Sequence, residues 1–414
     1  MNLKKTGIAL ACAMTVFLTA CNDSDKDDVV LQPQPQTPLY IGEAAYSKDT
    51  VSNASNVQVM RYKMLGVKDE LVETTALVMY PKTERPKDGW RAVVWAHGTV
   101  GSGDSCAPSV NSLNPRFKPL AEDLLAKGYV VIAPDYEGLG TQGIHPYLNL
   151  KSAANAMTYA VKAFAQQQGT AFKGDWVSVG QSQGGHASLA TAEYASNDPH
   201  YKAAVAAAPA SSLGYIIGTI APTALKQLVA GESLGLVQPG TAKYVNAELL
   251  SYAAYVVTGI KAYQPDFDYK ALFQEPSKFQ VEKAEGTTGD NGLCLQPLMM
   301  EFANDIDVYL QKNPSKTAAD YPGLVPGFEK NPTVEKFLAE NQPATKKINV
   351  PVMIIQGEQD MAVPLDVTKN LQQNLINLGT NVTFVPVPNA GHTEAIVQKQ
   401  AELIQFIQQY LPAK

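Results

Sequence analysis

The sequence predicts an α/β fold in which helices cover both faces of a mostly parallel sheet. Short apolar segments typical of buried strands alternate with segments of helical periodicity, from about residue 57 to the C-terminus. Such alternation favours a parallel sheet, because each crossover helix packs against a face of the sheet. One long stretch, residues 211–346, interrupts the alternation and predicts an insertion.

The composition is that of a globular protein. Of the 414 residues, 45% are hydrophobic and 17% are charged, and the formal net charge is -6 at pH 7. The chain has no long run of Lys and Arg, whereas a nucleic-acid-binding protein needs a clustered basic surface. We therefore expect no nucleic-acid partner, and the sequence leaves the oligomeric state open.

Residues 1–20 have the organisation of an export signal. Lys4 and Lys5 form a short charged region. The apolar segment 7–18 that follows is shorter than a comfortable membrane span. We therefore predict a signal peptide over residues 1–20 and an exported mature protein.

Cys21 directly follows this signal, at the end of Leu18-Thr19-Ala20-Cys21, which resembles a bacterial lipobox. In such signals the cysteine becomes the lipid-modified first residue of the mature protein. An ordinary secretory signal followed by a chance cysteine is the alternative. Asn22 stands where an inner-membrane lipoprotein has Asp. We therefore expect an outer-membrane lipoprotein that faces the periplasm or the cell surface, with a secreted protein as the alternative.

Residues 21–38 predict a disordered linker. They are polar and acidic at first and then rich in Gln and Pro, which leaves too few apolar side chains to form a core. A linker of this kind would let a domain anchored through Cys21 stand off a membrane.

Two cysteines remain in the folded part, Cys106 and Cys294. In an oxidising compartment two thiols suggest one disulfide. Closing a loop of this length stabilises a protein by roughly 4–5 kcal/mol in the chain-entropy account, less any strain. Two buried free thiols are the alternative.

The predicted sheet domain occupies residues 39–210 and 347–414. Strands are predicted at residues 57–64, 71–80, 92–96, 129–133, 176–179, 203–208, 352–356 and 382–387. Helices are predicted at residues 120–127, 151–168 and 184–195, and after each of the last two strands. The first two strands are close enough along the chain to form a hairpin.

The insertion at residues 211–346 is rich in Tyr, Leu, Ala, Gly and Pro. A structureless loop of this length is rare inside a compact domain. We therefore expect a mainly helical cap that lies over the carboxyl edge of the sheet.

The segment Gly180-Gln181-Ser182-Gln183-Gly184 matches the nucleophile-elbow pattern G-x-S-x-G. A predicted strand leads into it and a predicted helix leads out. In such a turn only small residues fit two places either side of the serine, whose oxygen is exposed at the helix N-terminus, where negative charge is favoured. We predict that Ser182 is a nucleophile, and a Gly-rich structural turn is the alternative.

A serine hydroxyl is a weak nucleophile that needs a base, and in this arrangement the histidine base follows the serine along the chain. His392 lies in a loop after strand 382–387 and before the last helix, so we predict that it is the base. The other histidine clearly downstream, His200, starts a strand at the edge of the sheet away from this site.

The histidine in turn needs an acid that holds its tautomer and stabilises the imidazolium. This acid should follow the preceding strand, and strand 352–356 leads into Gly357-Glu358-Gln359-Asp360. We predict Asp360 as the acid, with Glu358 and Asp366 as alternatives.

The negative charge that develops on a carbonyl oxygen needs two backbone N–H donors. Gln183 directly follows the nucleophile and supplies one of them. The other is expected from the loop His97-Gly98-Thr99, in which Gly98 lets the backbone approach the substrate and Thr99 is the predicted donor. For His97 we expect a structural role in bonding this loop.

Together these motifs resemble the α/β-hydrolase superfamily, and more narrowly the secretory lipases related to fungal lipase A. The resemblance extends over about residues 60–411. It is carried by Trp95-Ala96-His97-Gly98-Thr99, Cys106-Ala107-Pro108-Ser109, Asp135-Tyr136-Glu137-Gly138-Leu139-Gly140, His145-Pro146-Tyr147-Leu148, the elbow, Gly357-Glu358-Gln359-Asp360 and Gly391-His392.

The resemblance implies an α/β-hydrolase fold whose insertion is a lid or cap. It also implies that Cys106 pairs with Cys294, which would tie the region of the oxyanion loop to the cap. Gly98, Tyr136 and Glu137 would then contact the substrate at the rim of the site. For the segment that contains Tyr136 and Glu137, a Gly-rich turn needed for folding is the alternative.

These features predict a serine hydrolase that cleaves carboxylic esters, either small molecules or lipids such as triglycerides, through an acyl-enzyme intermediate. A serine peptidase on the same fold is one alternative, which the lack of a preceding propeller-like domain disfavours. A catalytically inactive surface-binding protein is another, which the complete set of Ser, Asp and His disfavours. The histidines lack Cys or acidic partners at metal-ligand spacing, so we predict no metal or other cofactor.

Overall fold

A computed structural model describes residues 38–414. The predicted signal peptide, Cys21 and all of the predicted linker except Pro38 lie outside the described residues. The sheet, the helices that cover it and the insertion all belong to the single unit that begins at Pro38.

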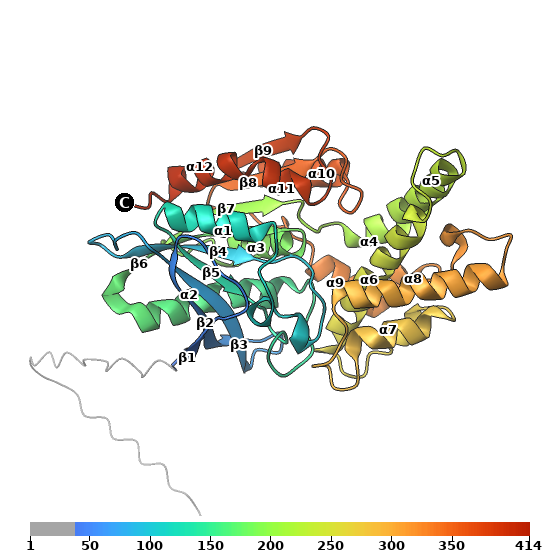
Figure 1. The fold of residues 1–414 in the computed structure, drawn as a ribbon, viewed down its shortest axis with the longest axis horizontal. Coiled ribbons are helices and arrows are strands. Elements are labelled where there is room, and N and C mark those ends of the chain that lie inside the picture. Colours follow the sequence, from blue (N-terminus) through green and yellow to red (C-terminus); the bar gives the residue numbers. More distant parts are fainter. Residues whose placement is uncertain (1–37) are drawn as a thin grey trace, which may run out of the picture. The chain divides into compact units, whose positions relative to one another are not determined.

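A nine-stranded sheet forms the centre of this unit, with the strand order β1-β2-β3-β5-β4-β6-β7-β8-β9 (Figure 1). Strands β4 to β9 run parallel, and β3 pairs antiparallel with β5. The bounds are β1 (Tyr40–Ala45), β2 (Ala54–Leu65), β3 (Leu71–Pro81), β4 (Trp90–Ala96), β5 (Val130–Pro134), β6 (Phe172–Gln181), β7 (Tyr201–Ala207), β8 (Val352–Gly357) and β9 (Val382–Val387). The predicted mostly parallel sheet is therefore confirmed.

Each predicted strand is present, and β2 and β3 form the expected hairpin, with Leu65 opposite Leu71. Strand β1 was not predicted. It lies at the edge of the sheet, pairs with β2, and has no fully buried residue, so its sequence YIGEAA lacks the alternation that marks a strand.

Helices cover both faces of the sheet, as predicted. One face packs against α2 (Leu150–Gln168), α3 (Gln183–Tyr194) and α10 (Leu365–Asn377). The opposite face packs against α1 (Phe117–Ala126), α11 (Glu394–Gln398) and α12 (Gln400–Tyr410).

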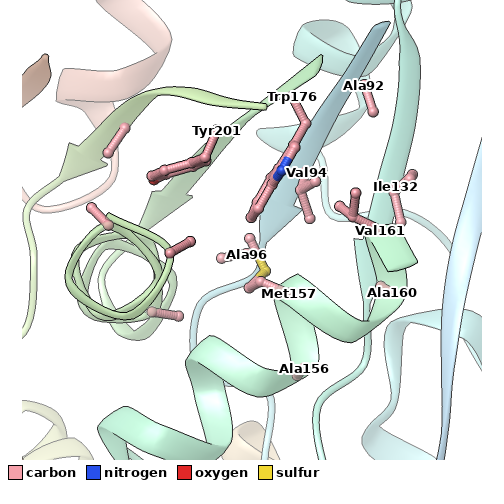
Figure 2. Packing of buried hydrophobic residues seen from close by; sticks show 14 of the residues in the cluster. Ala92, Val94, Ala96, Ile132, Ala156, Met157, Ala160, Val161, Trp176 and Tyr201 are labelled. Carbon is pink, nitrogen blue, oxygen red and sulfur yellow. The ribbon is translucent and has the colours of Figure 1, made fainter. Parts of the chain in front are cut away.

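Trp176 on β6 is central to the packing on the α2 face (Figure 2). Its side chain is 1% exposed, and its ring centroid lies 4.5 Å from that of Tyr201 on β7. Ala96 on β4 and Met157 on α2 belong to the same buried cluster and lie near each other below the indole (Figure 2). This packing fixes the position of β6, which leads directly into Ser182.

The chain between β7 and β8 is mainly helical and has its own hydrophobic core, which includes Leu250, Tyr255, Phe302 and Ile306. Figure 1 draws these helices beside the sheet. They are α4 (Leu213–Tyr215), α5 (Ala221–Ser233), α6 (Thr241–Lys261), α7 (Ser277–Glu285), α8 (Leu295–Lys312) and α9 (Pro332–Glu340).

The two ends of this insertion meet at its base. The backbone N–H of Ser212 donates a hydrogen bond to the side-chain oxygen of Gln342, at 2.7 Å. Beyond Gln342 the chain returns along α3, where the N–H of Thr345 donates to the Glu193 carboxylate at 3.1 Å. The predicted boundaries at residues 211 and 346 stay a prediction, and the closure at residues 212 and 342 lies just inside them.

One helical run in the insertion, Leu213–Ser233, is long and apolar enough to cross a membrane by length and composition. Core helices of soluble proteins pass the same test, so this is weak evidence for a membrane span. Only 17% of its most apolar window is buried, so most of the run lies at the surface of the insertion. The run contains a π-helical turn at Ile216–Ile220.

Candidate active site

Ser182 lies in the sharp turn between β6 and α3, with φ 60° and ψ -117°. A non-glycine residue in this region of backbone space costs of order 1–3 kcal/mol, so the surrounding structure must hold it there. A Cβ atom added at Gly180 would overlap the carbonyl oxygen of Gly184, and one added at Gly184 would overlap that of Ala96. The two glycines of the motif are therefore required by the space available.

The side chains of Ser182, His392 and Asp360 form one hydrogen-bonded row. His392 Nε2 lies 2.9 Å from Ser182 Oγ, and His392 Nδ1 lies 2.8 Å from Asp360 Oδ2. Each residue follows the carboxyl end of a parallel strand, β6, β8 or β9, which is why residues far apart in sequence meet here.

The carboxylate of Asp360 is fully buried and saturated with donors. Its Oδ1 accepts hydrogen bonds from the backbone N–H groups of Ala362 and Val363, at 2.9 and 2.8 Å. Its Oδ2 accepts from the side-chain NH₂ of Gln356 at 2.9 Å, in addition to His392. This set of donors fixes the orientation of the carboxylate and compensates for its burial.

Neither alternative acid takes part in this row. Glu358 is exposed, and the side chain of Asp366 is 93% exposed. His200 lies at the amino end of β7, where its Nδ1 is 3.0 Å from the Asp175 carboxylate. The structure therefore brings Asp360 and His392, and not these alternatives, to Ser182.

The two predicted oxyanion donors belong to the start of α3 and to the loop after β4. Gln183 is the first residue of α3, so its backbone N–H has no partner within the helix. The loop after β4 passes so close that a Cβ at Gly98 would lie 3.8 Å from Ser182 Cβ. Gly98, Thr99, Ser182 and His392 line one cavity of about 520 Å³.

His97 bonds this loop from behind, which is the structural role expected for it. Its ring is buried, with Nδ1 donating to the Gly98 carbonyl at 2.7 Å and Nε2 lying 3.2 Å from the Asp135 carbonyl. Burial lowers the pKa of His97 below its ordinary value. The buried ring therefore supports the oxyanion loop through its contacts with the backbone of Gly98 and Asp135.

A sequence profile of the secretory lipases matches residues 119–414, well over half of the chain. The chain belongs to the secretory lipase family. It is therefore a carboxylic ester hydrolase, and the family's description indicates export. No sequence among the curated proteins compared with it is significantly similar.

Solved structures show that this secretory lipase has the α/β-hydrolase fold. The rice cell wall degrading esterase LipA from Xanthomonas oryzae is 19% identical with a TM-score of 0.65, over 91% of this chain and 99% of that one. Candida antarctica lipase A in its closed state is 17% identical with a TM-score of 0.65, over 90% and 82% of the two chains. A putative hydrolase from Legionella pneumophila is 16% identical with a TM-score of 0.65, over 91% and 99%.

The structure of the lipase contains a disulfide between Cys106 and Cys294, 188 residues apart. It joins the loop that follows Thr99 to the start of α8 in the insertion. The backbone continues this connection, because the N–H of Leu295 donates to the Val100 carbonyl at 2.9 Å. The alternative of two free thiols is therefore wrong for this structure.

Tyr136 and Glu137 lie behind the site in this lipase. The Tyr136 hydroxyl donates to the His97 carbonyl at 3.0 Å, and the Glu137 carboxylate accepts from the Val67 N–H and the Ser152 hydroxyl. Within residues 38–414, neither lines the cavities that meet at Ser182. We therefore correct the expected substrate contact of both residues to a structural role, and Gly98 remains the candidate contact.

A second cavity opens at Ser182 and His392 on the side of the insertion. It has a volume of about 80 Å³ and an almost entirely apolar wall. Its lining includes Leu213, Ile217, Val256, Phe328, Val334 and Leu338.

Among residues 38–414, no group of three or more His, Cys, Asp or Glu side chains is placed to share a metal ion.

Two polar residues of the site carry no motif and were missed from the sequence. Gln356 orients Asp360, and its own amide is held by the Thr368 hydroxyl, which donates to Gln356 Oε1 at 2.7 Å. Gln181 donates from its side chain to the His392 carbonyl at 3.0 Å, which fixes the loop that carries the base. Gln181 directly precedes Ser182 and Gln356 stands shortly before Asp360, but nothing in these positions indicates the side-chain contacts that the structure shows.

Proposed function

We propose that the chain hydrolyses carboxylic esters with Ser182 as nucleophile, His392 as general base and acid, and Asp360 as the acid that orients the histidine. The observation that carries this proposal is the continuous hydrogen-bonded row of the three side chains at a strained elbow. Nucleophile, base and orienting group lie within the distances that a serine hydrolase needs.

The hydrogen bonds assign the protons in the resting state. Nδ1–H of His392 donates to Asp360, so Nε2 carries the lone pair that accepts the Ser182 hydroxyl. As Ser182 Oγ bonds to the ester carbonyl carbon, its proton passes to Nε2. The imidazolium that forms is stabilised by the buried carboxylate of Asp360.

The carbonyl oxygen becomes an oxyanion in this step and faces the backbone N–H groups of Thr99 and Gln183. The tetrahedral intermediate then collapses, the bond to the alcohol oxygen breaks, and His392 returns its proton to that oxygen. The acyl group is left on Ser182. A water molecule, deprotonated by His392, attacks the acyl carbon. The bond from this carbon to Ser182 Oγ then breaks, His392 returns the proton to Oγ, and the carboxylic acid is released.

The two cavities that meet at Ser182 favour one orientation of the substrate. The small apolar cavity under the insertion suits an acyl chain, because apolar walls exclude water around methylene groups. The larger cavity also has a mainly apolar wall, but Asn111, Asn114 and Gln296 add polar groups to it, so we assign it to the alcohol part. We infer that the insertion acts as a cap that selects the acyl group.

We also propose that Cys21 carries a lipid that holds the enzyme on the outer membrane. The support for this is the sequence Leu18-Thr19-Ala20-Cys21 at the end of the export signal and the linker composition that follows. A substrate embedded in or released from a membrane would then be close to the catalytic domain.

Labelling with a fluorophosphonate probe tests the catalytic proposal. We expect stoichiometric labelling of the wild type and none of Ser182→Ala. The wild type should also hydrolyse p-nitrophenyl esters of several chain lengths and leave a peptide p-nitroanilide intact. Equal labelling of Ser182→Ala would refute the assignment of the nucleophile, and turnover of the anilide without the esters would favour a peptidase.

A further inference from the structure

The side chains of both proposed oxyanion donors bond to the same short segment, His145–Tyr147. The side-chain NH₂ of Gln183 donates to Nε2 of His145 at 3.0 Å. The hydroxyl of Thr99 lies 2.6 Å from the hydroxyl of Tyr147. Gln183 and Thr99 belong to elements that are far apart in the sequence, α3 and the loop after β4, so this shared attachment is a feature of the tertiary fold.

The hydrogen bonds of His145 fix its tautomer. Its Nδ1–H donates to the Glu137 carbonyl at 2.8 Å, so Nε2 is left as an acceptor for Gln183. Burial lowers the pKa of His145 to about 4, which keeps the ring neutral near pH 7. Among residues 38–414, His145 is not part of the lining of either cavity at Ser182, and its hydrogen bond to Gln183 is its direct link to the elbow.

Other residues contact the segment His145–Tyr147 on both of its sides. Toward the core, the ring of Tyr136 stacks on that of His145, with centroids 5.9 Å apart. Toward the cap, α6 comes so close that a Cβ at Gly259 would lie 2.6 Å from the Tyr147 nitrogen. The ring of Tyr255, also on α6, meets Tyr147 edge-on at 5.8 Å. The segment is thus a rigid support between the cap and the elbow.

We infer that His145 and Tyr147 are positioning residues that set the directions of the two oxyanion donors, His145 through Gln183 and Tyr147 through Thr99. The inference rests on the proposed function, because it presupposes that these backbone N–H groups bind the oxyanion. Small errors in the placement of such groups reduce turnover strongly, by up to roughly 100-fold for 1 Å.

A matched pair of variants tests the role of His145. Asn at this position keeps a donor where Nδ1 stands but offers nothing to Gln183, whereas Gln offers an oxygen where Nε2 stands. We expect His145→Asn to lower kcat roughly 10-fold with little change in KM, and His145→Gln to keep most of the turnover. Rates are expressed per site labelled to completion with the fluorophosphonate, so misfolded protein does not count.

Gln183→Met provides the same test should His145→Asn fail to fold, because it removes the side-chain donor and leaves the backbone N–H in place. Affinity for a trifluoromethyl ketone, whose adduct with Ser182 carries an oxyanion, should fall by the same factor as kcat. Affinity for an unreactive ether analogue of the ester should not change. A loss of packing alone would not separate the two inhibitors in this way.

Tyr147 lines the apolar cavity, so a change at this residue can also act on the substrate directly. A double-mutant cycle with Thr99 isolates the contribution of their hydroxyl pair. Thr99→Val and Tyr147→Phe each remove one hydroxyl of the pair, and we expect the double variant to be no slower than the slower single variant. Additive effects in the cycle, or full kcat per labelled site in His145→Asn or Gln183→Met, would overturn the inference. A wild type that neither labels nor hydrolyses esters would instead refute the proposed function.

Discussion

Two single glycines, Gly180 and Gly184, allow Ser182 to adopt its backbone conformation in the elbow. The backbone at Ser182 is strained, and it is held there because β6, α3 and the end of β4 approach one another at Gly180 and Gly184. No side chain fits at either glycine without a movement of backbone atoms. The elbow therefore depends on two residues that take no part in the chemistry.

Gly184→Ala should consequently disrupt the elbow, because the new Cβ overlaps the Ala96 carbonyl oxygen. We expect a loss of several kcal/mol in the free energy of unfolding and a loss of most fluorophosphonate labelling. Gly42→Ala is the control, since a Cβ there meets no atom within 4 Å. Urea unfolding of both variants measures the difference, and equal stabilities would contradict the steric argument.

Buried histidines outside the row make the stability of the fold depend on pH. His186 on α3 is buried, its Nε2–H donates to the Asn341 carbonyl at 3.0 Å, and burial lowers its pKa to about 4. The unfolded chain, with a His pKa near the ordinary 6.5, binds more protons than the folded protein between these values. The free energy of unfolding must therefore fall as the pH drops from 6.5 to 4.

His186→Gln should flatten this dependence, because Gln can still donate to the Asn341 carbonyl but does not titrate. We expect the variant to lose less stability than the wild type between pH 7 and pH 4.5, by up to about 3 kcal/mol. Urea unfolding at the two pH values gives the comparison. His200→Gln, at an exposed site, is the control, and identical pH slopes for wild type and His186→Gln would count against the argument.

At the scale of elements, strand ends and helix starts explain how the site could be predicted. Ser182, Asp360 and His392 each follow an apolar strand, and parallel strands bring their carboxyl ends to one edge, so the order of motifs was enough to predict which residues meet. The contacts of Gln356 and His145 could not be predicted in this way. These contacts depend on how a side-chain amide or ring meets a residue of another element. Such contacts produce no recurrent spacing of residues along the sequence.

For Tyr136 and Glu137 the sequence led to a contact that the structure does not have, namely a contact with the substrate. The resemblance to the secretory lipases implied a role for these residues at the rim of the site. The backbone of Tyr136 has φ 73°, however, and its side chain is buried toward His97. A positive φ at a bulky residue is rare, and nothing in the local sequence predicts it.

Helix α6 forms part of the wall of the apolar cavity, and this gives a test of its proposed role. Val256→Trp should narrow the cavity, so we expect kcat/KM for a p-nitrophenyl ester with a long acyl chain to fall at least roughly 10-fold more than that for the acetate. Val245→Trp on the same helix is the control, because Val245 is outside the described lining of both cavities. Equal losses at all chain lengths would indicate that the acyl chain lies elsewhere.

At the scale of the whole molecule, we expect the catalytic unit that begins at Pro38 and the segment before it to have separate tasks. The unit holds all the residues to which we assign chemistry, while the anchoring prediction rests on residues before it, namely the export signal with Leu18-Thr19-Ala20-Cys21 and the linker composition. We therefore expect that the anchoring can be changed without a change in the catalytic activity.

Cys21→Ser should release the enzyme from the membrane fraction and leave its activity per molecule unchanged on a soluble ester. Fractionation of cells that express each form, with immunoblotting and an ester assay of every fraction, measures both quantities. Retention of Cys21→Ser in the membrane fraction would show that the lipid-anchor proposal is wrong.

The contact between Ser212 and Gln342 has a consequence for how such enzymes diversify. Because the two ends of the insertion meet at its base, the chain enters and leaves it at two neighbouring points. Its hydrophobic core is formed largely by its own residues, and the disulfide Cys106–Cys294 and the contact of α6 with Tyr147 add further attachments to the sheet domain. A coding segment of this kind can be exchanged between genes or lengthened without a change in strand order, and closing a longer loop costs little. Substrate choice can then evolve by recombination at two neighbouring points while the catalytic residues stay in place.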